Sequence, residues 1–348
     1  MTWEELIDLA IARGASDVLV SPGSPPVLKI QGTLEAQPAG VMTGELARRI
    51  VEGLLTPDGL AAFRATGDHD FGVTLHGRRF RGNAFLRHGE PGLALRLFPA
   101  EIPTPDELGL PSILSDLVLA PSGLILVTGA AGQGKSTSQA ALIRHLNERQ
   151  TRHVVTIEDP IEYVHTPIQS VIDQREVGRD TRTFASGLRH VFRQAPDVIL
   201  VGEMRDPETM DAALSVAETG HLVLSTVHAS DAVQALARIV DAYPEPARDA
   251  VRTQLSRVVS AVVNQRLVVG VDGKRVLACE VLVNGPAVSA QIREGHFEQI
   301  YSTMEIEQRL GMQTLNHALE ALVQEGKVHE KLARRYMVAR ESRVGRRT

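Results

Sequence analysis

The sequence contains one cysteine, Cys279, which excludes a disulfide within the chain and a cysteine-rich zinc site. It also lacks any apolar run that approaches the roughly 20 residues of a membrane-spanning helix. The first residues, Met1–Glu5, are acidic and lack the apolar core of a signal peptide. These absences predict a cytoplasmic protein whose association with a membrane is at most peripheral.

The chain also has a small net charge and few aromatic side chains. The net charge is −5, and aromatic residues make up 4% of the chain. Because nucleic-acid binding relies on basic surfaces and, for single strands, on aromatic stacking, we expect no nucleic acid among the partners. The hydrophobic content of 43% and the charged content of 23% are those of an ordinary globular protein. A length of 348 residues favours two domains.

The pattern of the chain changes near residue 98. Residues 1–98 predict a small α+β domain, with a helix that begins after Thr2 and short strands at 17–20, 27–30, 71–75, 79–86 and 93–97. Residues 99–110 contain three prolines and are predicted to form a linker.

Residues 111–348 show a different pattern, in which apolar segments alternate with helical ones and the pattern is helical from about 285 onward. The apolar segments are 124–127, 153–157, 198–201 and 222–225. Continuous apolar strands of this kind are typical of a parallel sheet that is covered on both faces. We therefore predict an α/β domain whose ligand lies at the carboxyl ends of the strands.

A phosphate-binding loop is the most informative motif of the chain. Residues 129–136 follow the pattern G-x-x-x-x-G-K-S, directly after an apolar strand and before a helical segment. Glycines let backbone N–H groups close around phosphate oxygens, Lys135 supplies a cation for the β- and γ-phosphates, and the Ser136 hydroxyl is a ligand for Mg²⁺. The motif predicts binding of a nucleoside triphosphate. The residues predicted to contact it are Gly129, Ala130, Ala131, Gly132, Gln133, Gly134, Lys135, Ser136 and Thr137.

Two acidic segments follow strands of the same predicted domain. Glu158, Asp159 and Glu162 come after strand 153–157, where carboxylates could polarise a water or hold waters bound to magnesium. A charged surface loop is the alternative interpretation of this segment. Glu203 follows strand 198–201 and Gly202, which is a Walker-B arrangement in which the carboxylate contacts magnesium through water.

Histidines and arginines supply further candidates. His221 and His228 flank strand 222–227, and their odd spacing sends them to opposite faces, so we do not expect a shared metal. His228, at the carboxyl end, can reach a γ-phosphate or the catalytic carboxylate, although a packed histidine is the alternative. Arg81 and Arg96 lie on predicted strands of the first domain. They are either part of a solvated face or arginine fingers, each worth roughly 10³-fold or more in rate.

These motifs together resemble the type II/IV secretion ATPase superfamily and, within it, the ATPases of type IV pilus retraction. The resemblance runs nearly from end to end of the chain. Apart from the phosphate loop, it includes Thr156–His165, Gly202–Asp206, Ala217–His221 and Gly311–Thr314. The glutamate box, Gly202–Asp206, together with the strand flanked by two histidines is highly specific to this superfamily.

The resemblance implies a PAS-like N-terminal domain, a RecA-like ATPase domain and a homohexamer that hydrolyses ATP with Mg²⁺. By motif position, Glu162 activates water, Glu203 is the Walker-B residue, and His221 with His228 forms a histidine box. Arg81 and Arg96 reach the nucleotide within a subunit or from a neighbour. The implied function is pilus retraction and twitching motility at the inner face of the cytoplasmic membrane. The implied partners are an inner-membrane platform protein and, indirectly, pilin subunits.

The chain departs from the family pattern at three places, one of which is Leu19, where many relatives carry histidine. The family loop usually reads Gly-Pro-Thr-Gly-Ser-Gly-Lys-Ser-Thr, whereas this chain has Ala130, Ala131 and Gln133. The family segment Ala-Ile-Arg-Asn-Leu-Ile-Arg-Glu, which is associated with retraction, is altered at residues 287–294. The alternatives are an accessory retraction ATPase, another secretion-system ATPase, a nucleotide sensor with little turnover, and a nucleic-acid-dependent RecA-like motor.

Overall fold

The computed structural model describes residues 1–337, so the last part of the predicted ATPase domain, 338–348, lies outside the described residues. The chain divides into two compact units. The first unit contains Met1–Ile102 and Pro160–Val164, and the second contains Pro103–Asp159 and the chain from His165 onward. The sequence pattern indicated one division, at 99–110, and did not indicate that residues 160–164 belong with the first unit.

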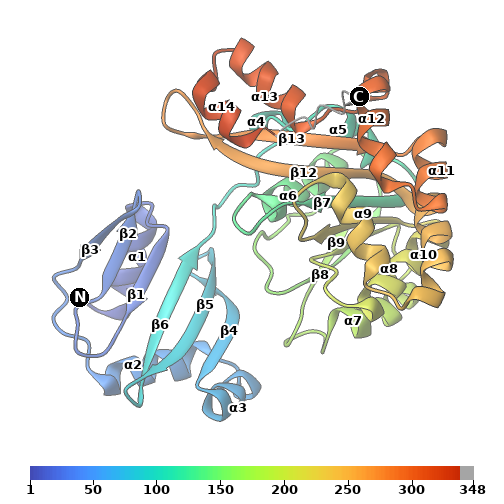
Figure 1. Ribbon diagram of the computed structural model, residues 1–348. Coiled ribbons are helices and arrows are strands. Elements are labelled where there is room, and N and C mark those ends of the chain that lie inside the picture. The colour runs from blue at the N-terminus through green and yellow to red at the C-terminus, as the bar shows by residue number, and fades with distance from the viewer. Residues whose placement is uncertain (338–348) are drawn as a thin grey trace. The chain divides into compact units, whose positions relative to one another are not determined.

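The first unit is built on a six-stranded sheet with the order β3-β2-β1-β6-β5-β4, in which neighbouring strands are antiparallel (Figure 1). Every strand predicted for this part of the chain is present, and β3 is an additional, mostly exposed strand. The core contains Leu6, Ile7, Val18, Phe80 and Leu95. In chain order the elements are α1 (Trp3–Ala12), β1 (Asp17–Val20), β2 (Val27–Ile30), β3 (Thr33–Ala36), α2 (Gly44–Leu54), α3 (Pro57–Thr66), β4 (Asp68–Leu75), β5 (Arg78–Arg87) and β6 (Glu90–Leu97).

The second unit is built on a seven-stranded sheet with the order β13-β12-β7-β11-β10-β8-β9. All neighbours are parallel except β12 and β13, which form an antiparallel hairpin. Within residues 1–337, no helix is both long enough and apolar enough to cross a membrane. The strands are β7 (Gly123–Thr128), β8 (His153–Glu158), β9 (Val171–Glu176), β10 (Val198–Val201), β11 (Leu222–Val227), β12 (Val259–Val269) and β13 (Arg275–Val283).

The helices of the second unit cover both faces of this sheet (Figure 1). They are α4 (Pro105–Leu108), α5 (Ile113–Leu117), α6 (Lys135–Asn147), α7 (Phe184–Val191), α8 (Pro207–Glu218), α9 (Ala232–Asp241), α10 (Glu245–Val258), α11 (Pro286–Glu294), α12 (Phe297–Ile306), α13 (Leu315–Gln324) and α14 (Glu330–Tyr336), with 3-10 turns at Phe192–Gln194 and Gln308–Leu310.

The continuous apolar strands are explained by burial on both faces. Leu124 and Leu126 of β7 pack in one cluster with side chains of α8, α9 and α10. Ile125, between them, packs on the other face with α5 and α6. Because successive side chains of a strand point to opposite faces, a strand with two covered faces needs apolar residues at every position.

The predicted linker contains a short helix, α4, which the sequence pattern did not indicate. Thr104 caps the helix, because its hydroxyl accepts a hydrogen bond from the Glu107 backbone N–H at 3.2 Å. Pro105 occupies the first helical position, where proline is favoured. A proline that indicates a stiff linker therefore also serves as a helix start.

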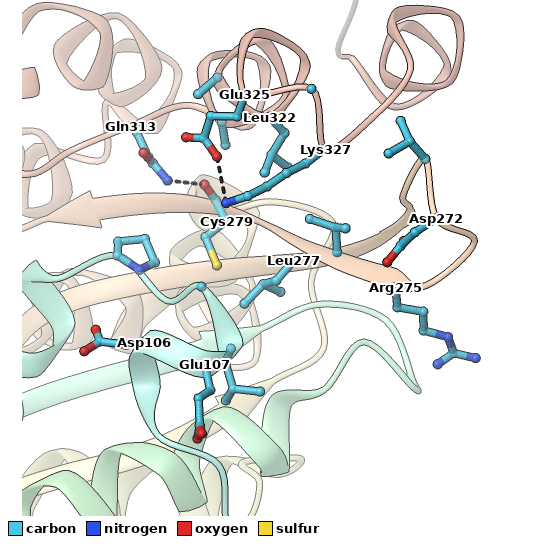
Figure 2. A pocket seen from close by; sticks show the side chains of 18 residues that line it. Asp106, Glu107, Asp272, Arg275, Leu277, Cys279, Gln313, Leu322, Glu325 and Lys327 are labelled. Atoms are coloured by element: carbon cyan, nitrogen blue, oxygen red, sulfur yellow. Dashed lines mark hydrogen bonds and ion pairs between the residues drawn. The ribbon is translucent and has the colours of Figure 1, made fainter.

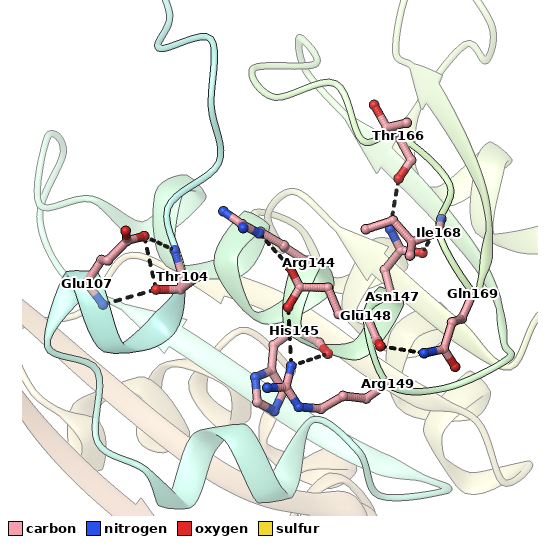
Figure 3. Close-up of polar contacts among 10 residues, drawn as sticks. All are labelled: Thr104, Glu107, Arg144, His145, Asn147, Glu148, Arg149, Thr166, Ile168 and Gln169. Atoms are coloured by element: carbon pink, nitrogen blue, oxygen red, sulfur yellow. Dashed lines mark hydrogen bonds and ion pairs between the residues drawn. The ribbon is translucent and has the colours of Figure 1, made fainter.

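Asn147, at the end of α6, fixes the segment that leads to β9 (Figure 3). Its side-chain amide donates to the carbonyl oxygen of Thr166 at 2.9 Å, and its carbonyl accepts from the N–H of Ile168 at 2.9 Å. Because Asn147 is 2% exposed, these contacts are shielded from water. The far end of the helix that follows the phosphate loop is thus tied to the segment after the acidic motif.

Candidate nucleotide-binding site

The phosphate loop joins β7 to α6, in the order of strand, loop and helix that the sequence predicts. Gly129 has φ 138° and Gly134 has φ 84°, values that residues with a side chain rarely adopt. A Cβ atom on Gly129 would lie 2.7 Å from the carbonyl oxygen of Gln265. Glycine is therefore required at the start of the loop by a close approach to β12.

Lys135 and the beginning of α6 form a positively charged cradle. The Lys135 ammonium donates to the carbonyl oxygens of Gly129 and Ala130 at 2.9 and 3.0 Å, so it lies over its own loop. Gly134, at the N-cap, has no side chain with which to cap the helix. A helix N-terminus beside a lysine favours an anion, and this arrangement fits a nucleotide phosphate.

Gln133, one of the departures from the family loop, anchors the loop to the sheet. Its carbonyl oxygen accepts a hydrogen bond from the Leu267 N–H at 2.6 Å. The pairing of β7 with β12 ends at Thr128 and Asn264, so Leu267 lies beyond the end of β7. Because β7 has ended at this point, the Gln133 side chain takes the place of a strand neighbour as the acceptor for the Leu267 N–H.

Glu203 and His228 meet at the carboxyl ends of the neighbouring strands β10 and β11. The His228 Nε2 lies 3.6 Å from a carboxylate oxygen of Glu203, whose side chain is 14% exposed. Arg205 forms an ion pair with the same carboxylate. Burial, followed by the positive charge of Lys135, lowers the pKa of His228, while Glu203 opposes this shift. Together these influences favour the neutral form of the His228 imidazole.

The acidic segment after β8 is divided between the two units. In the second unit, a Glu158 carboxylate oxygen accepts from the Thr156 hydroxyl at 2.6 Å and from the Gln174 amide at 3.1 Å. Asp159 ends this part of the chain, and Glu162 belongs to the first unit. There the Arg79 Nε donates to the carbonyl oxygen of Ile161 at 2.8 Å and holds the segment that carries Glu162. The catalytic role of Glu162 stays a prediction.

Arg81 and Arg96 lie opposite each other on β5 and β6, so they share one exposed face of the first sheet. An Arg81 guanidinium nitrogen lies 3.5 Å from the carboxylate of Asp70. The Arg96 Nε donates to Asp17 at 3.0 Å. The structure thus pairs the two arginines on one surface, and their contact with a nucleotide stays a prediction.

His221 lies at the other end of β11 from His228. It precedes Leu222, which pairs with Gly123 at the start of β7, whereas the phosphate loop follows the end of β7. A strand of six residues separates these ends by roughly 20 Å. The His221 ring contacts the Thr219 hydroxyl at 3.0 Å. Within this chain His221 is therefore distant from the phosphate loop, and its role in nucleotide binding stays a prediction.

A cavity of about 640 Å³ borders β13, α4 and α13 (Figure 2). The Gln313 amide donates to the Cys279 carbonyl oxygen at 2.8 Å at its edge, and Lys327 pairs with Glu325 at 2.8 Å. Burial raises the pKa of the Cys279 thiol to about 12, so the thiol stays protonated. Among the described residues that line the cavity, none is predicted to bind nucleotide.

The sequence interpretation missed the polar residues of β12 that border the phosphate loop. Asn264 and Gln265 are each 2% exposed. The Asn264 amide donates to the Thr128 hydroxyl at 3.0 Å, and the Gln265 amide donates to the Ser138 hydroxyl of α6. The signal that could have indicated them is the polar run Asn-Gln-Arg inside an otherwise apolar strand.

The buried His165, at the end of the acidic motif, is expected to make the stability of the folded protein depend on pH. Burial lowers its pKa to about 4, whereas an unfolded histidine has a pKa near 6.5. Below pH 6.5 the unfolded chain therefore binds a proton at His165, whereas the folded chain binds it only near pH 4. The free energy of unfolding therefore decreases as the pH is lowered from 6.5 to 4. We expect a loss of about 2 kcal/mol between pH 7 and pH 5 from this group, measured by urea unfolding.

The matched variants for this prediction are His165→Asn and His88→Asn, the latter at an exposed histidine. The first should lose less stability between pH 7 and pH 5 than the unchanged protein, and the second should behave like the unchanged protein. The same pH dependence in all three would contradict the assignment to His165.

Comparison with known proteins groups the chain with secretion and pilus ATPases. The family description "Type II/IV secretion system protein" matches residues 106–337. The chain is 40% identical to the type IV pilus ATPase PilU of Pseudomonas aeruginosa, over 94% of this chain and 86% of the relative. It is 38% identical to the type IV pilus retraction ATPase PilT of the same organism, over 96% of this chain and 97% of the relative. A crystal structure of the pilus retraction motor PilT with bound ADP resembles it with a TM-score of 0.91 and 38% identity, covering 98% of both chains.

Proposed function

The chain belongs to the type II/IV secretion system protein family, and we propose that it is the ATP-driven motor of type IV pilus retraction. Its fold is that of the family, a RecA-like ATPase core preceded by a small α+β PAS-like domain. The observation that supports the proposal is the similarity to PilT over 98% of both chains, which includes both units and not the ATPase core alone.

In the proposed reaction, residues 129–137 hold the ATP phosphates, and Lys135 neutralises charge that develops on the β- and γ-phosphates. Bound Mg²⁺ supplies further neutralisation, and Ser136 and, through water, Glu203 are the residues that would hold it. Glu162 orients and activates the attacking water.

Other residues complete the proposed site. Arg81 and Arg96 neutralise charge on the transferred phosphoryl group, within a subunit or from a neighbour. Glu158 and Asp159 would orient waters around a bound metal, and His228 supports the carboxylate of Glu203.

The altered phosphate loop is compatible with turnover. The glycines and Lys135 of the family loop remain in this chain, and Gln133 accepts a hydrogen bond from the Leu267 N–H. A nucleotide sensor without turnover is therefore less well supported than an ATPase.

The proposed assembly is a homohexamer that acts on an inner-membrane platform protein and, indirectly, on pilin subunits. It works in the cytoplasm at the inner face of the membrane, and nucleic acid is not among its partners. An accessory retraction ATPase is the second candidate, because the identity to PilU, 40%, is slightly higher than the identity to PilT, 38%.

Deletion of the gene tests this function. We expect cells with excess surface pili that do not twitch, because pili extend but are not withdrawn. Bald cells would overturn the retraction role in favour of extension. Retraction that persists at reduced force, with normal numbers of pili, would favour the accessory role. Purified protein that hydrolyses no ATP would overturn the motor itself.

A further inference from the structure

We propose that Asn264 of β12 and Glu280 of β13 form a buried clamp that positions His228, and that Glu280 couples this position to helix α13. The proposal rests on the proposed function, because it requires His228 to act at the nucleotide. Asn264 and Glu280 pair across the hairpin, so their side chains lie next to each other on one face. Both are 2% exposed.

The segment that follows His228 is held at both ends by these two side chains. The Asn264 amide donates to the carbonyl oxygen of Ala229 at 3.3 Å. A carboxylate oxygen of Glu280 accepts from the N–H of Ala232, the first residue of α9, at 2.7 Å. Arg238 of α9 adds a third contact, because its guanidinium donates to the His228 carbonyl oxygen at 2.8 Å. The backbone around His228 is therefore fixed from β12, β13 and α9.

Asn264 also connects His228 to the phosphate loop. The same side-chain amide donates to the hydroxyl of Thr128, which immediately precedes Gly129. One buried amide thus holds the segment that carries His228 and the base of the loop that carries Lys135. β7 and β11 also pair directly up to Thr128 and Val227, so the Asn264 amide adds a side-chain link to the strand pairing that spaces the two loops.

Glu280 also lies beside the start of α13. Its neighbour Val281 donates to the Gln313 carbonyl oxygen at 2.8 Å and accepts from the Gln313 N–H at 3.0 Å, just before Leu315, the first residue of α13. The carboxylate therefore lies near the N-termini of α9 and α13, where the helix dipoles favour a negative charge. Burial raises the pKa of Glu280, and the hydrogen bond from the Ala232 N–H opposes this shift.

A buried carboxylate at position 280 is explained by the hydrogen bonds that it accepts and not by packing. Burial of a charged group is costly unless hydrogen bonds compensate it, and here the Ala232 N–H at the start of α9 supplies such a bond. A carboxylate has only acceptor oxygens, whereas glutamine replaces one of them with an amide that only donates. Glu280→Gln therefore keeps the size of the side chain and weakens its hold on the start of α9, beside the start of α13.

The kinetic test compares Glu280→Gln, His228→Ala and the double variant. We expect Glu280→Gln to lower kcat roughly 10-fold, the scale of a lost hydrogen bond to a charged group, with KM for ATP nearly unchanged. In the His228→Ala background, Glu280→Gln should cause no further loss, because it acts through His228. Equal losses in both backgrounds, or no loss in either, would overturn the positioning role.

Amide hydrogen exchange tests the coupling without relying on activity. Thr314 caps α13, and its hydroxyl accepts from the His317 N–H at 3.3 Å. In the full chain, Thr314→Ala should speed exchange in residues 228–234, and this effect should vanish when Glu280→Gln is added. An effect that survives Glu280→Gln, or that never reaches residues 228–234, would overturn the coupling.

A matched control and a second variant complete the design. Asn284 of the same hairpin region donates to the Ser256 carbonyl oxygen at 3.0 Å, so Asn284→Ala removes a similar bond away from His228 and should leave exchange in 228–234 unchanged. If Glu280→Gln does not fold, Asn264→Ala replaces it and should speed exchange in the same residues. A wild-type protein without ATPase activity would remove the proposed function, whereas the exchange results would still decide the clamp.

Discussion

Lys135→Ala is expected to lower kcat for ATP hydrolysis roughly 10²–10³-fold, the scale of losing one preorganised charge-stabilising group. The ammonium lies over the loop, bound to two of its carbonyl oxygens, so alanine removes the cation and loosens the cradle. ADP should also stabilise the variant less. At 100 times its Kd a ligand adds about 2.7 kcal/mol to the stability of the unchanged protein, and a thermal-shift titration measures how much of this remains.

Lys274→Ala is the matched control, because Lys274 is 84% exposed in the turn between β12 and β13. It should hydrolyse ATP and bind ADP like the unchanged protein. Equal hydrolysis by Lys135→Ala and Lys274→Ala would contradict the assignment of the phosphate loop.

Glu162→Gln is expected to lower kcat roughly 10²–10⁴-fold while ATP binding is retained, because general base catalysis contributes on this scale. Glutamine keeps the shape of the side chain but cannot accept the proton of the attacking water. The measurement is single-turnover hydrolysis together with binding of a slowly hydrolysed ATP analogue. The expected variant holds ATP and releases almost no phosphate.

Glu45→Gln, at an exposed carboxylate of α2, makes the same chemical change outside the proposed site. It should leave kcat and binding unchanged. Loss of binding by Glu162→Gln in parallel with kcat would indicate that Glu162 supports the fold or the nucleotide and does not activate water. Arg79→Ala is the informative companion, because Arg79 holds the backbone next to Glu162.

Much of the fold was predictable because the core strands of the second unit are buried on both faces. Such strands consist of uninterrupted apolar residues, and β7, β8, β10 and β11 were found from this pattern. The hairpin of β12 and β13 was not predicted. Its polar residues Asn264 and Gln265 break the apolar run, and they are tolerated because they bond to Thr128 and Ser138 from elsewhere in the chain.

The candidate site, like the fold, could be predicted from the sequence only in part. The sequence by itself determined the phosphate loop, because its glycines, Lys135 and Ser136 are contiguous and act through local backbone geometry. Only the tertiary structure decided which distant groups join it. Strand direction places His228 beside Glu203 and leaves His221 at the amino end of β11, and strand pairing sets Asn264 beside Glu280. Contacts of this kind depend on strand order and register, which arise from packing of the whole sheet and not from any single segment of the chain.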